Sequence, residues 1–134
     1  QQAIRTRKLK LLSNVNQQRN FIAMRRVCRK TELLVTDILN ERKLGVFNIG
    51  STSSKTLLNM AVIIQERCKR VLGFEPEIQY NNKLKDPIIT PLIYKTMRLH
   101  KKDTDFDENS DLKEIDQLIE YCKSIYLDKK SNNE

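Results

Sequence analysis

Glycine, histidine and tryptophan are scarce in this chain, and their scarcity excludes several kinds of protein. The 134 residues include three glycines, one histidine and no tryptophan. The glycines are isolated, so the sequence has no Gly-rich turn of the kind that binds a cofactor pyrophosphate at a helix amino end. The single histidine, His100, has no partner spaced for catalysis or metal binding, and we expect it at the surface. Without tryptophan, and with 39% hydrophobic residues, any core must be aliphatic and modest.

The sequence contains no signal for export or for insertion into a membrane. No apolar run approaches the length of a membrane span, and the amino end has no signal-peptide core. The three cysteines, Cys28, Cys68 and Cys122, are odd in number and lack metal-ligand spacing, and each falls in an apolar helical pattern. We therefore predict buried, reduced thiols in a cytoplasmic protein without a membrane partner. The chain begins with Gln1, which is consistent with a fragment or a processed product.

Positive charge is concentrated in the first third of the chain. The net charge is +8, and residues 1–50 hold 11 Lys or Arg against 3 acidic residues, whereas residues 51–134 hold equal numbers. A one-sided basic surface attracts phosphate, either on a nucleotide or on nucleic acid. The alternative is a solvated basic face that binds nothing.

The hydrophobic pattern predicts strands that alternate with helices. Strands are expected at 9–12, 46–49 and 76–80, with a further extended stretch at 19–24. Helices are expected from after residue 24 to about 42, where Val35 and Leu39 accompany the apolar stripe, from 57 to about 72, and from 111 to 126. Gly73 suits the end of the second helix, while Ser51 and Thr52 are interpreted as its capping residues. Between the last two helices, Pro87 and Pro91 punctuate an irregular segment with one helical turn at 94–99, and 128–134 is expected to be a disordered tail.

Three segments form an ordered set of motifs. Residues 14–28 (Asn-Val-Asn-Gln-Gln-Arg-Asn-Phe-Ile-Ala-Met-Arg-Arg-Val-Cys) are similar to Gly-x-Gln-x-Arg-Asp-Phe-Ile-x-Val-x-Asp-Val. Residues 45–51 (Gly-Val-Phe-Asn-Ile-Gly-Ser) match Gly-x-(Phe/Tyr)-Asn-(Ile/Val)-Gly-Ser. Residues 56–61 and 73–78 resemble an amphipathic helix followed by a Gly-x-x-Pro-x-Ile strand. In this order the motifs resemble the second half of the NAD-dependent epimerase/dehydratase family, the extended short-chain dehydrogenases.

The resemblance implies an α+β fold in which residues 1–127 are the carboxyl-terminal, substrate-binding portion and the Rossmann half is missing. The implied substrate is a sugar nucleotide, such as a UDP-, dTDP- or GDP-sugar. In the intact family NAD or NADP is held by the Rossmann half, which another chain could supply, so we expect no cofactor on this chain alone. The implied activity of the whole enzyme is that of an oxidoreductase or isomerase.

The resemblance also assigns roles to individual residues. Arg19 matches the Arg that contacts the substrate diphosphate, and a guanidinium presents a planar fork of donors to phosphate oxygens. Gln17, Gln18 and Phe21 are expected to shape the loop around it. Asn48 and Gly50 match structural positions, with Gly50 expected to let the chain turn from strand to helix.

Several departures from the family pattern bear on activity. The acidic pair before Val27 is Arg25-Arg26 here, so an expected helix-capping Asp is absent, and Asn16 stands where Gly is usual. The family's second phosphate-binding Arg has only Lys83, Lys85 and Arg98 as candidates, none securely aligned. The catalytic Tyr and Lys, four residues apart in the family, are absent, because Tyr94 is followed by Arg98. We therefore expect no catalysis by this chain alone, a pattern that a decayed gene would also show.

Two other interpretations remain open. The run 103–114 (Asp-Thr-Asp-Phe-Asp-Glu-Asn-Ser-Asp-Leu-Lys-Glu) has oxygen ligands at five positions of a calcium loop but lacks its Gly, so a structural remnant with a degenerate calcium-type loop is one alternative. We favour instead an acidic loop whose charges stabilise the amino end of the last helix, and no metal site. The other alternative is a basic nucleic-acid-binding module, which the scattered tyrosines and phenylalanines disfavour because they form no stacking platform.

Overall fold

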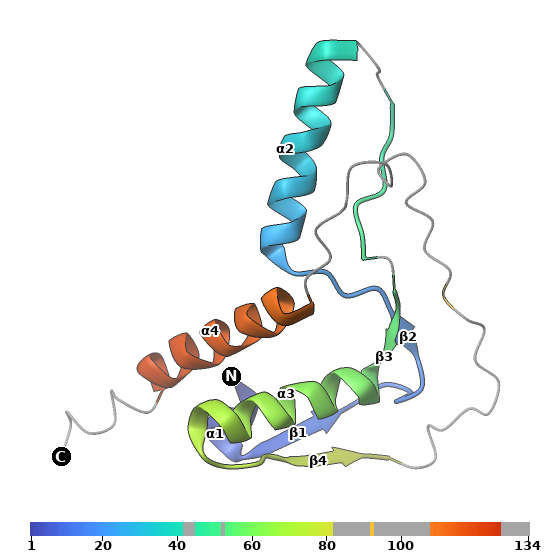
Figure 1. Cartoon of the computed structure of the whole chain (residues 1–134). Helices are drawn as coiled ribbons and strands as arrows, with labels where there is room; N and C mark the ends of the chain where they lie inside the picture. Colours follow the sequence, from blue (N-terminus) through green and yellow to red (C-terminus); the bar gives the residue numbers. More distant parts are fainter. Residues whose placement is uncertain (42–44, 52, 82–91, 93–107, 127–134) are drawn as a thin grey trace.

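A computed structural model describes residues 1–41, 45–51, 53–81, 92 and 108–126 (Figure 1). The helices are α1 (Gln2–Thr6), α2 (Met24–Glu41), α3 (Leu57–Leu72) and α4 (Glu108–Tyr126), and the strands are β1 (Lys8–Leu11), β2 (Gln18–Arg19), β3 (Lys55–Thr56) and β4 (Glu77–Tyr80). The fold is therefore α+β, as the sequence predicts. None of the described helices combines the length and the apolar character needed to cross a membrane.

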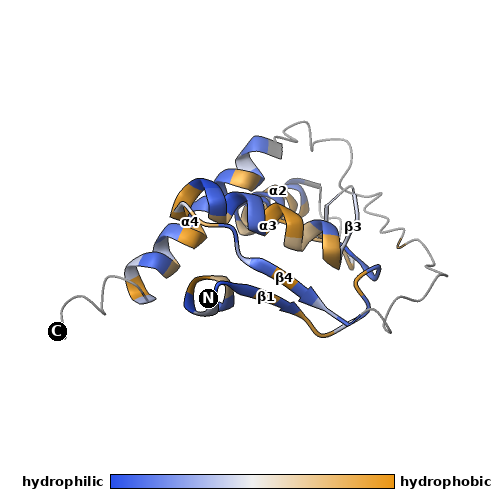
Figure 2. Cartoon of the chain, turned by 90° about the horizontal axis from the view of Figure 1, so that it is seen from below, coloured by the Kyte–Doolittle hydropathy of each residue, from blue (hydrophilic) through white to orange (hydrophobic). Residues whose placement is uncertain are grey.

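The strands form two separate pairs. β1 lies parallel to β4 with Leu9 opposite Ile78, and α3 provides the crossover that a parallel pair requires (Figure 2). β2 and β3 form a short antiparallel pair in which Arg19 lies opposite Lys55. Both pairs join segments that are far apart in the sequence, so they hold the first quarter of the chain against its middle.

α3 matches its sequence prediction closely. Its apolar residues recur at helical spacing, and Ala61 and Cys68 are buried on the inner face. The helix ends at Gly73, whose φ of 75° is the left-handed conformation that glycine adopts easily and whose N–H donates to the Lys69 carbonyl. The prediction that Ser51 and Thr52 cap this helix is wrong. The capping side chain is Thr56, whose hydroxyl oxygen accepts the Asn59 N–H at 3.0 Å. Ser51 is buried in the preceding segment and does not cap the helix, and Thr52 lies outside the described residues.

A small core joins α1, β1, α3 and α4. Its buried residues are Ala3, Ile4, Cys68 and Ile119. Half-buried side chains surround them, namely Leu9, Ile64, Val71, Leu72, Ile115, Cys122 and Tyr126. At the edge of this core Arg67 of α3 forms an ion pair with Asp116 of α4, and the Arg67 side chain holds the pKa of Asp116 below its ordinary value. The core is aliphatic, as the composition indicates.

α2 projects from this core and is attached to α4 at its amino end (Figure 1). The Glu114 carboxylate of α4 accepts the backbone N–H groups of Met24 at 2.7 Å and of Arg25 at 3.3 Å. One turn earlier on α4, Asp111 pairs with Arg26 at 3.1 Å. Glu114 therefore supplies, from another helix, the acceptor that the missing capping Asp would have provided.

Two predictions from the apolar pattern are wrong. Residues 46–49 do not form a buried strand, since Val46 is 87% exposed and no described segment pairs with it. Cys28 is exposed on α2, as is Leu39 at 75%, and Cys122 is only half-buried, so only Cys68 is fully buried as predicted. The reason is the same in each case: an apolar face becomes buried only where another element covers it. The expected irregular segment with His100 and the tail 128–134 lie outside the described residues.

Candidate functional site

The loop that carries Arg19 is fixed by hydrogen bonds to the start of α3 and to the 45–51 segment. The Val15 and Gln17 carbonyls accept the N–H groups of Leu58 at 3.0 Å and of Leu57 at 3.1 Å. Asn20 exchanges two hydrogen bonds with the backbone of Ser51, at 2.7 and 2.9 Å. The first, second and third motif segments are therefore adjacent in space.

The four predicted site residues do not all face the same way. Arg19 is exposed, and its Nη2 donates to the Gln17 Oε1 at 3.1 Å, so these two side chains act together. Gln18 points elsewhere, since its Oε1 accepts the Leu92 N–H at 2.8 Å. Phe21 is half-buried and lines a groove beside β2. Gln17, Arg19 and Phe21 thus follow the alternation of an extended chain, with Gln18 on the opposite side.

The groove next to Phe21 has a volume of about 630 Å³. Its walls come from residues 21–24, from the segment before α3 and the first half of α3, and from residues 111–121 of α4. The walls are mostly apolar, with Phe21, Met60 and Leu118 among them, and Ser51, Ser53 and Lys55 add polar groups. A concave apolar surface of this size with a few polar groups is typical of a small-molecule site.

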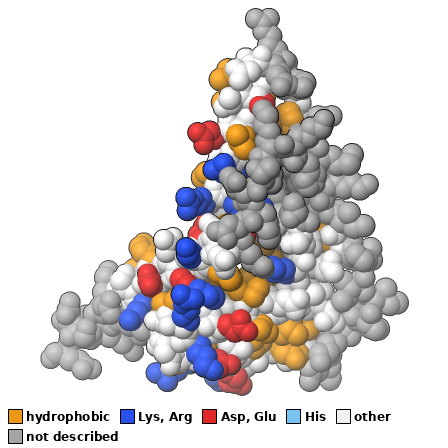
Figure 3. All heavy atoms as spheres, in the orientation of Figure 1, with side chains coloured by type: hydrophobic (Ala, Val, Ile, Leu, Met, Phe, Trp, Pro, Cys, Tyr) orange, Lys and Arg blue, Asp and Glu red, His pale blue; other side chains and the backbone are white. Residues whose placement is uncertain are grey.

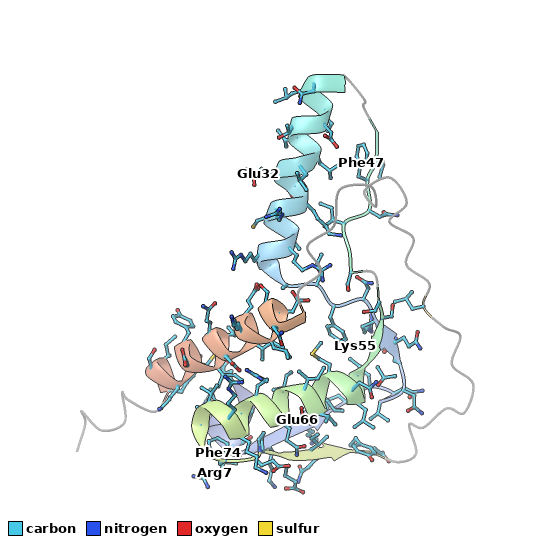
Figure 4. The ribbon with its side chains drawn as sticks, viewed as in Figure 1. Arg7, Glu32, Phe47, Lys55, Glu66 and Phe74 are labelled. Carbon is cyan, nitrogen blue, oxygen red and sulfur yellow. The ribbon has the colours of Figure 1, made fainter. Side chains whose placement is uncertain are left out.

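Lys55 is a groove-lining residue that the sequence did not single out. It lies on β3, where Figure 4 labels it. The antiparallel register sets it directly opposite Arg19, and its side chain lines the groove. The prediction missed it because the two cations are 36 positions apart in the sequence and only the antiparallel register brings them together. The signal in the sequence was weak, a single lysine among serines and threonines before an amphipathic helix.

Several cations of the basic first third have structural partners. Arg26 pairs with Asp111, and the Nζ of the buried Lys30, only 3% exposed, donates to the Gly50 carbonyl at 2.9 Å. Arg7 lies over the ring of Phe74, with 4.8 Å between the guanidinium carbon and the ring centroid. Both residues are labelled in Figure 4. On the face drawn in Figure 3, acidic side chains lie among the lysines and arginines, so the cations do not form a continuous basic surface there.

The predicted calcium-type loop and the candidate second phosphate ligands lie partly or wholly outside the described residues. Of the calcium-type run, residues 103–107 lie outside the described part, and Asp111 and Glu114 have their contacts with α2. Within the described ranges, no group of three or more His, Cys, Asp or Glu side chains is placed to hold a metal ion. The candidate second phosphate ligands Lys83, Lys85 and Arg98 are likewise outside the described residues, as is Tyr94.

Arg19 and Lys55 bring two positive side chains to one strand ladder, and Lys55 also lines the groove. In comparisons with known proteins, no family model matches the chain, and no curated protein is significantly similar to it.

Proposed function

We propose that this chain is the sugar-nucleotide-binding part of an NAD(P)-dependent sugar-nucleotide epimerase, dehydratase or reductase, and that it is not catalytic on its own. The observation that carries the proposal is the contact among the three motif segments. Asn20 of the first is bonded to Ser51 of the second, and β1 beside the first motif pairs with β4 of the third. Motifs that resemble consecutive parts of one family are thus neighbours in space, as a shared binding site requires.

Arg19 is the residue proposed to bind the diphosphate. It is exposed, and Gln17 orients its guanidinium by accepting a hydrogen bond from it. The β2–β3 pair that carries it is held by the bond of the Leu57 N–H to the Gln17 carbonyl on one side and by the Asn20–Ser51 bonds on the other. An oriented guanidinium loses less side-chain freedom when it binds a phosphate, and it donates two parallel hydrogen bonds to the oxygens. Gln18 would support the loop through Leu92, and Phe21 would contact the ligand from the groove.

The cofactor is assigned to a Rossmann half outside this chain. The residues present do not fit NAD or NADP, because the three glycines are isolated and none of them belongs to a Gly-rich turn. When bound in the intact enzyme, the nicotinamide would accept and return a hydride of the sugar. The contribution of this chain is then to hold and orient the sugar nucleotide.

The exposed apolar residues fit a chain that normally packs on another half. Leu39 on α2 is 75% exposed and Val46 is 87% exposed. Large apolar side chains that are this exposed are what we expect where another domain covers the surface in the intact protein. We therefore expect the isolated chain to be marginally stable.

Thermal unfolding with and without millimolar UDP-, dTDP- and GDP-sugars tests the proposal. A ligand present at about 100 times its dissociation constant stabilises the folded state by about 2.7 kcal/mol, so the melting temperature should rise by several degrees. Arg19→Ala should abolish the rise. Lys10→Ala is the matched control, because it removes an exposed positive charge from β1 and should leave the rise intact.

Absence of a shift with all three sugar nucleotides would contradict the proposal. A shift with single-stranded RNA or DNA that disappears in moderate salt would favour the basic nucleic-acid-binding alternative instead.

A further inference from the structure

We propose that the exposed apolar side of α2 binds a second copy of this chain, with the two α2 helices antiparallel. This surface, the α2 stripe, consists of side chains three or four positions apart, namely Met24, Cys28, Thr31, Val35 and Leu39. The inference goes beyond the proposed function and does not depend on it, because neither Arg19 nor a sugar nucleotide takes part. It names a second copy as the chain that covers this part of the surface.

The α2 stripe is exposed although most of its side chains are apolar. Met24 is 65% exposed, Val35 is 51% exposed and Leu39 is 75% exposed. Cys28 is exposed as well. The Thr31 hydroxyl donates to a carbonyl of its own helix at 2.9 Å, so the one polar group of the stripe already has a partner. Apolar side chains that recur every three or four positions form the seam between paired helices.

The 45–51 segment lies along a different side of α2 (Figure 1). The buried Lys30 of α2 donates to the Gly50 carbonyl of this segment at 2.9 Å. In Figure 4, Phe47 lies on that side of the helix and Glu32 points to the opposite side. A second copy on the α2 stripe therefore leaves the 45–51 segment, with its exposed Val46, to the missing half.

The charges of α2 are separated along the helix. Its first eight residues carry only basic charges, and its last ten carry only acidic charges. This order opposes the helix dipole, which favours acidic residues near the amino end and basic residues near the carboxyl end. Four of the charged side chains also have interactions within their own chain, namely Arg26, Arg29, Lys30 and Asp37. The sign of each half of the helix stays the same, so α2 favours a neighbour with the reverse order of charges.

An antiparallel second copy has this reverse order and also matches the apolar positions. Met24 and Leu39 lie at equal distances from the middle of the α2 stripe, so a two-fold axis there sets one opposite the other. Cys28 and Val35 are related in the same way. The basic half of each helix then lies beside the acidic half of the other. A parallel pair would place like charges together, which repel, so the antiparallel pair is favoured.

The dimer is expected to be weak. α2 is about 27 Å long, because its 18 residues each rise about 1.5 Å. One pair of helices of this length makes a small interface, and small interfaces belong to transient complexes. The α2 stripe meets the groove at Met24, where the exposed Leu118 and Tyr121 of the groove wall add apolar surface. We expect a dissociation constant in the micromolar range, and exchange with the monomer leaves Cys28 open to reagents.

Sedimentation equilibrium of the full chain at increasing concentration tests the inference. The wild type should pass from monomer to dimer. Val35→Ser should weaken dimerisation by at least about tenfold, because the two-fold axis makes the substitution remove two buried valines at once. Val62→Ser is the matched control, since Val62 is 37% exposed on α3 and lies outside the α2 stripe, and it should dimerise like the wild type. Melting curves check that each variant folds.

Three results would overturn the inference. A wild type that stays monomeric at all concentrations would leave the α2 stripe to another chain, such as the missing half. Equal dimerisation of Val35→Ser and the wild type would place the interface elsewhere. An unfolded wild type would show that a second copy does not supply the cover that α2 lacks.

Disulfide formation tests the direction of the helix pair. Val35→Cys adds a thiol opposite Cys28 of the other copy, so mild oxidation should link its dimers through these two positions. The wild type should stay unlinked, because its two Cys28 residues would lie about 10 Å apart along the helix axes. Asn40→Cys is the control, since Asn40 is exposed on α2 outside the stripe, and it should also stay unlinked. Efficient linking of the wild type through Cys28 would show a parallel pair and overturn the inference.

Discussion

Asn20 and Ser51 hold each other through two opposed hydrogen bonds: the Asn20 Oδ1 accepts the Ser51 N–H at 2.7 Å, and the Asn20 Nδ2 donates to the Ser51 carbonyl at 2.9 Å. The Nδ2 also reaches the Ser53 carbonyl at 3.3 Å. The side-chain amide of Asn20 therefore continues the hydrogen bonding of the β2–β3 pair by one further residue. It fixes the backbone next to Arg19 against a segment that is 31 residues away in the sequence.

Replacing this amide should destabilise the fold. Asn20→Ala leaves the backbone groups of the buried Ser51 without these partners, and the expected loss is about 1–3 kcal/mol of unfolding free energy. Asn59→Ala is the control, because Asn59 is exposed on α3 and alanine favours a helix, so its stability should be unchanged or slightly higher. Urea unfolding of the three proteins measures the difference. Equal midpoints for Asn20→Ala and the wild type would contradict the structural role of this residue.

The Glu114 carboxylate should stabilise the amino end of α2 more than it stabilises α4, the helix to which Glu114 belongs. Glu114→Ala removes the acceptor of the Met24 and Arg25 N–H groups, and loss of a helix cap costs about 1 kcal/mol. Glu120→Ala removes an exposed carboxylate from the same helix and should change stability by less than about 0.5 kcal/mol. Hydrogen exchange should show faster exchange in the first turn of α2 for Glu114→Ala alone. Protection of α2 that is identical in both variants would rule out this capping contact.

The Arg67–Asp116 pair should make the free energy of unfolding depend on pH in the acidic range. The pKa of Asp116 is lowered in the folded protein, chiefly by its hydrogen bond from Arg67, so the unfolded chain binds its proton more tightly. The stabilisation is therefore fully present above the unfolded pKa, about 3.9, and is lost as the pH falls through the folded value. Asp116→Asn should be less stable than the wild type at pH 7, by about 1–3 kcal/mol.

That difference should shrink as the pH is lowered below about 4, because the unfolded wild-type chain then takes up a proton at Asp116 that the folded chain, with its lower pKa, does not yet bind. Urea unfolding of both proteins from pH 7 to pH 3 measures it. A difference that stays constant over this range would mean that the Asp116 charge does not contribute to stability.

The cysteines should react at very different rates. Cys28 is exposed on α2, whereas Cys68 is buried and burial raises the pKa of its thiol. Iodoacetamide should therefore modify Cys28 in the folded chain and reach Cys68 only after unfolding, as peptide mass spectrometry can show. Cys28→Ser should remove the fast-reacting site. Rapid native modification of Cys68 would contradict the packing of the core.

The sequence predicted those elements whose formation depends on residues adjacent in the chain. The apolar spacing of α3, the glycine that ends it and the extended runs of β1 and β4 are local patterns, and each element lies close to its predicted position. Arg19 was readable as a candidate only through a resemblance to known motifs. Its contact with Gln17 follows from two residues on the same side of an extended chain.

The failures share a physical cause. Residues 46–49 and the exposed face of α2 have apolar sequences, yet burial requires a covering element, and the described part of the chain provides none for Val46 or Leu39. The capping of α2 by Glu114 and the placement of Lys55 opposite Arg19 also depend on residues distant in sequence. The sequence by itself indicated α2, α3 and α4 as helices and the runs of β1 and β4 as extended, because local spacing and backbone preference decide those elements, whereas it did not single out α1 or β3. Only the tertiary structure decided which faces are covered and which cations meet, because those depend on strand register and helix packing between distant segments.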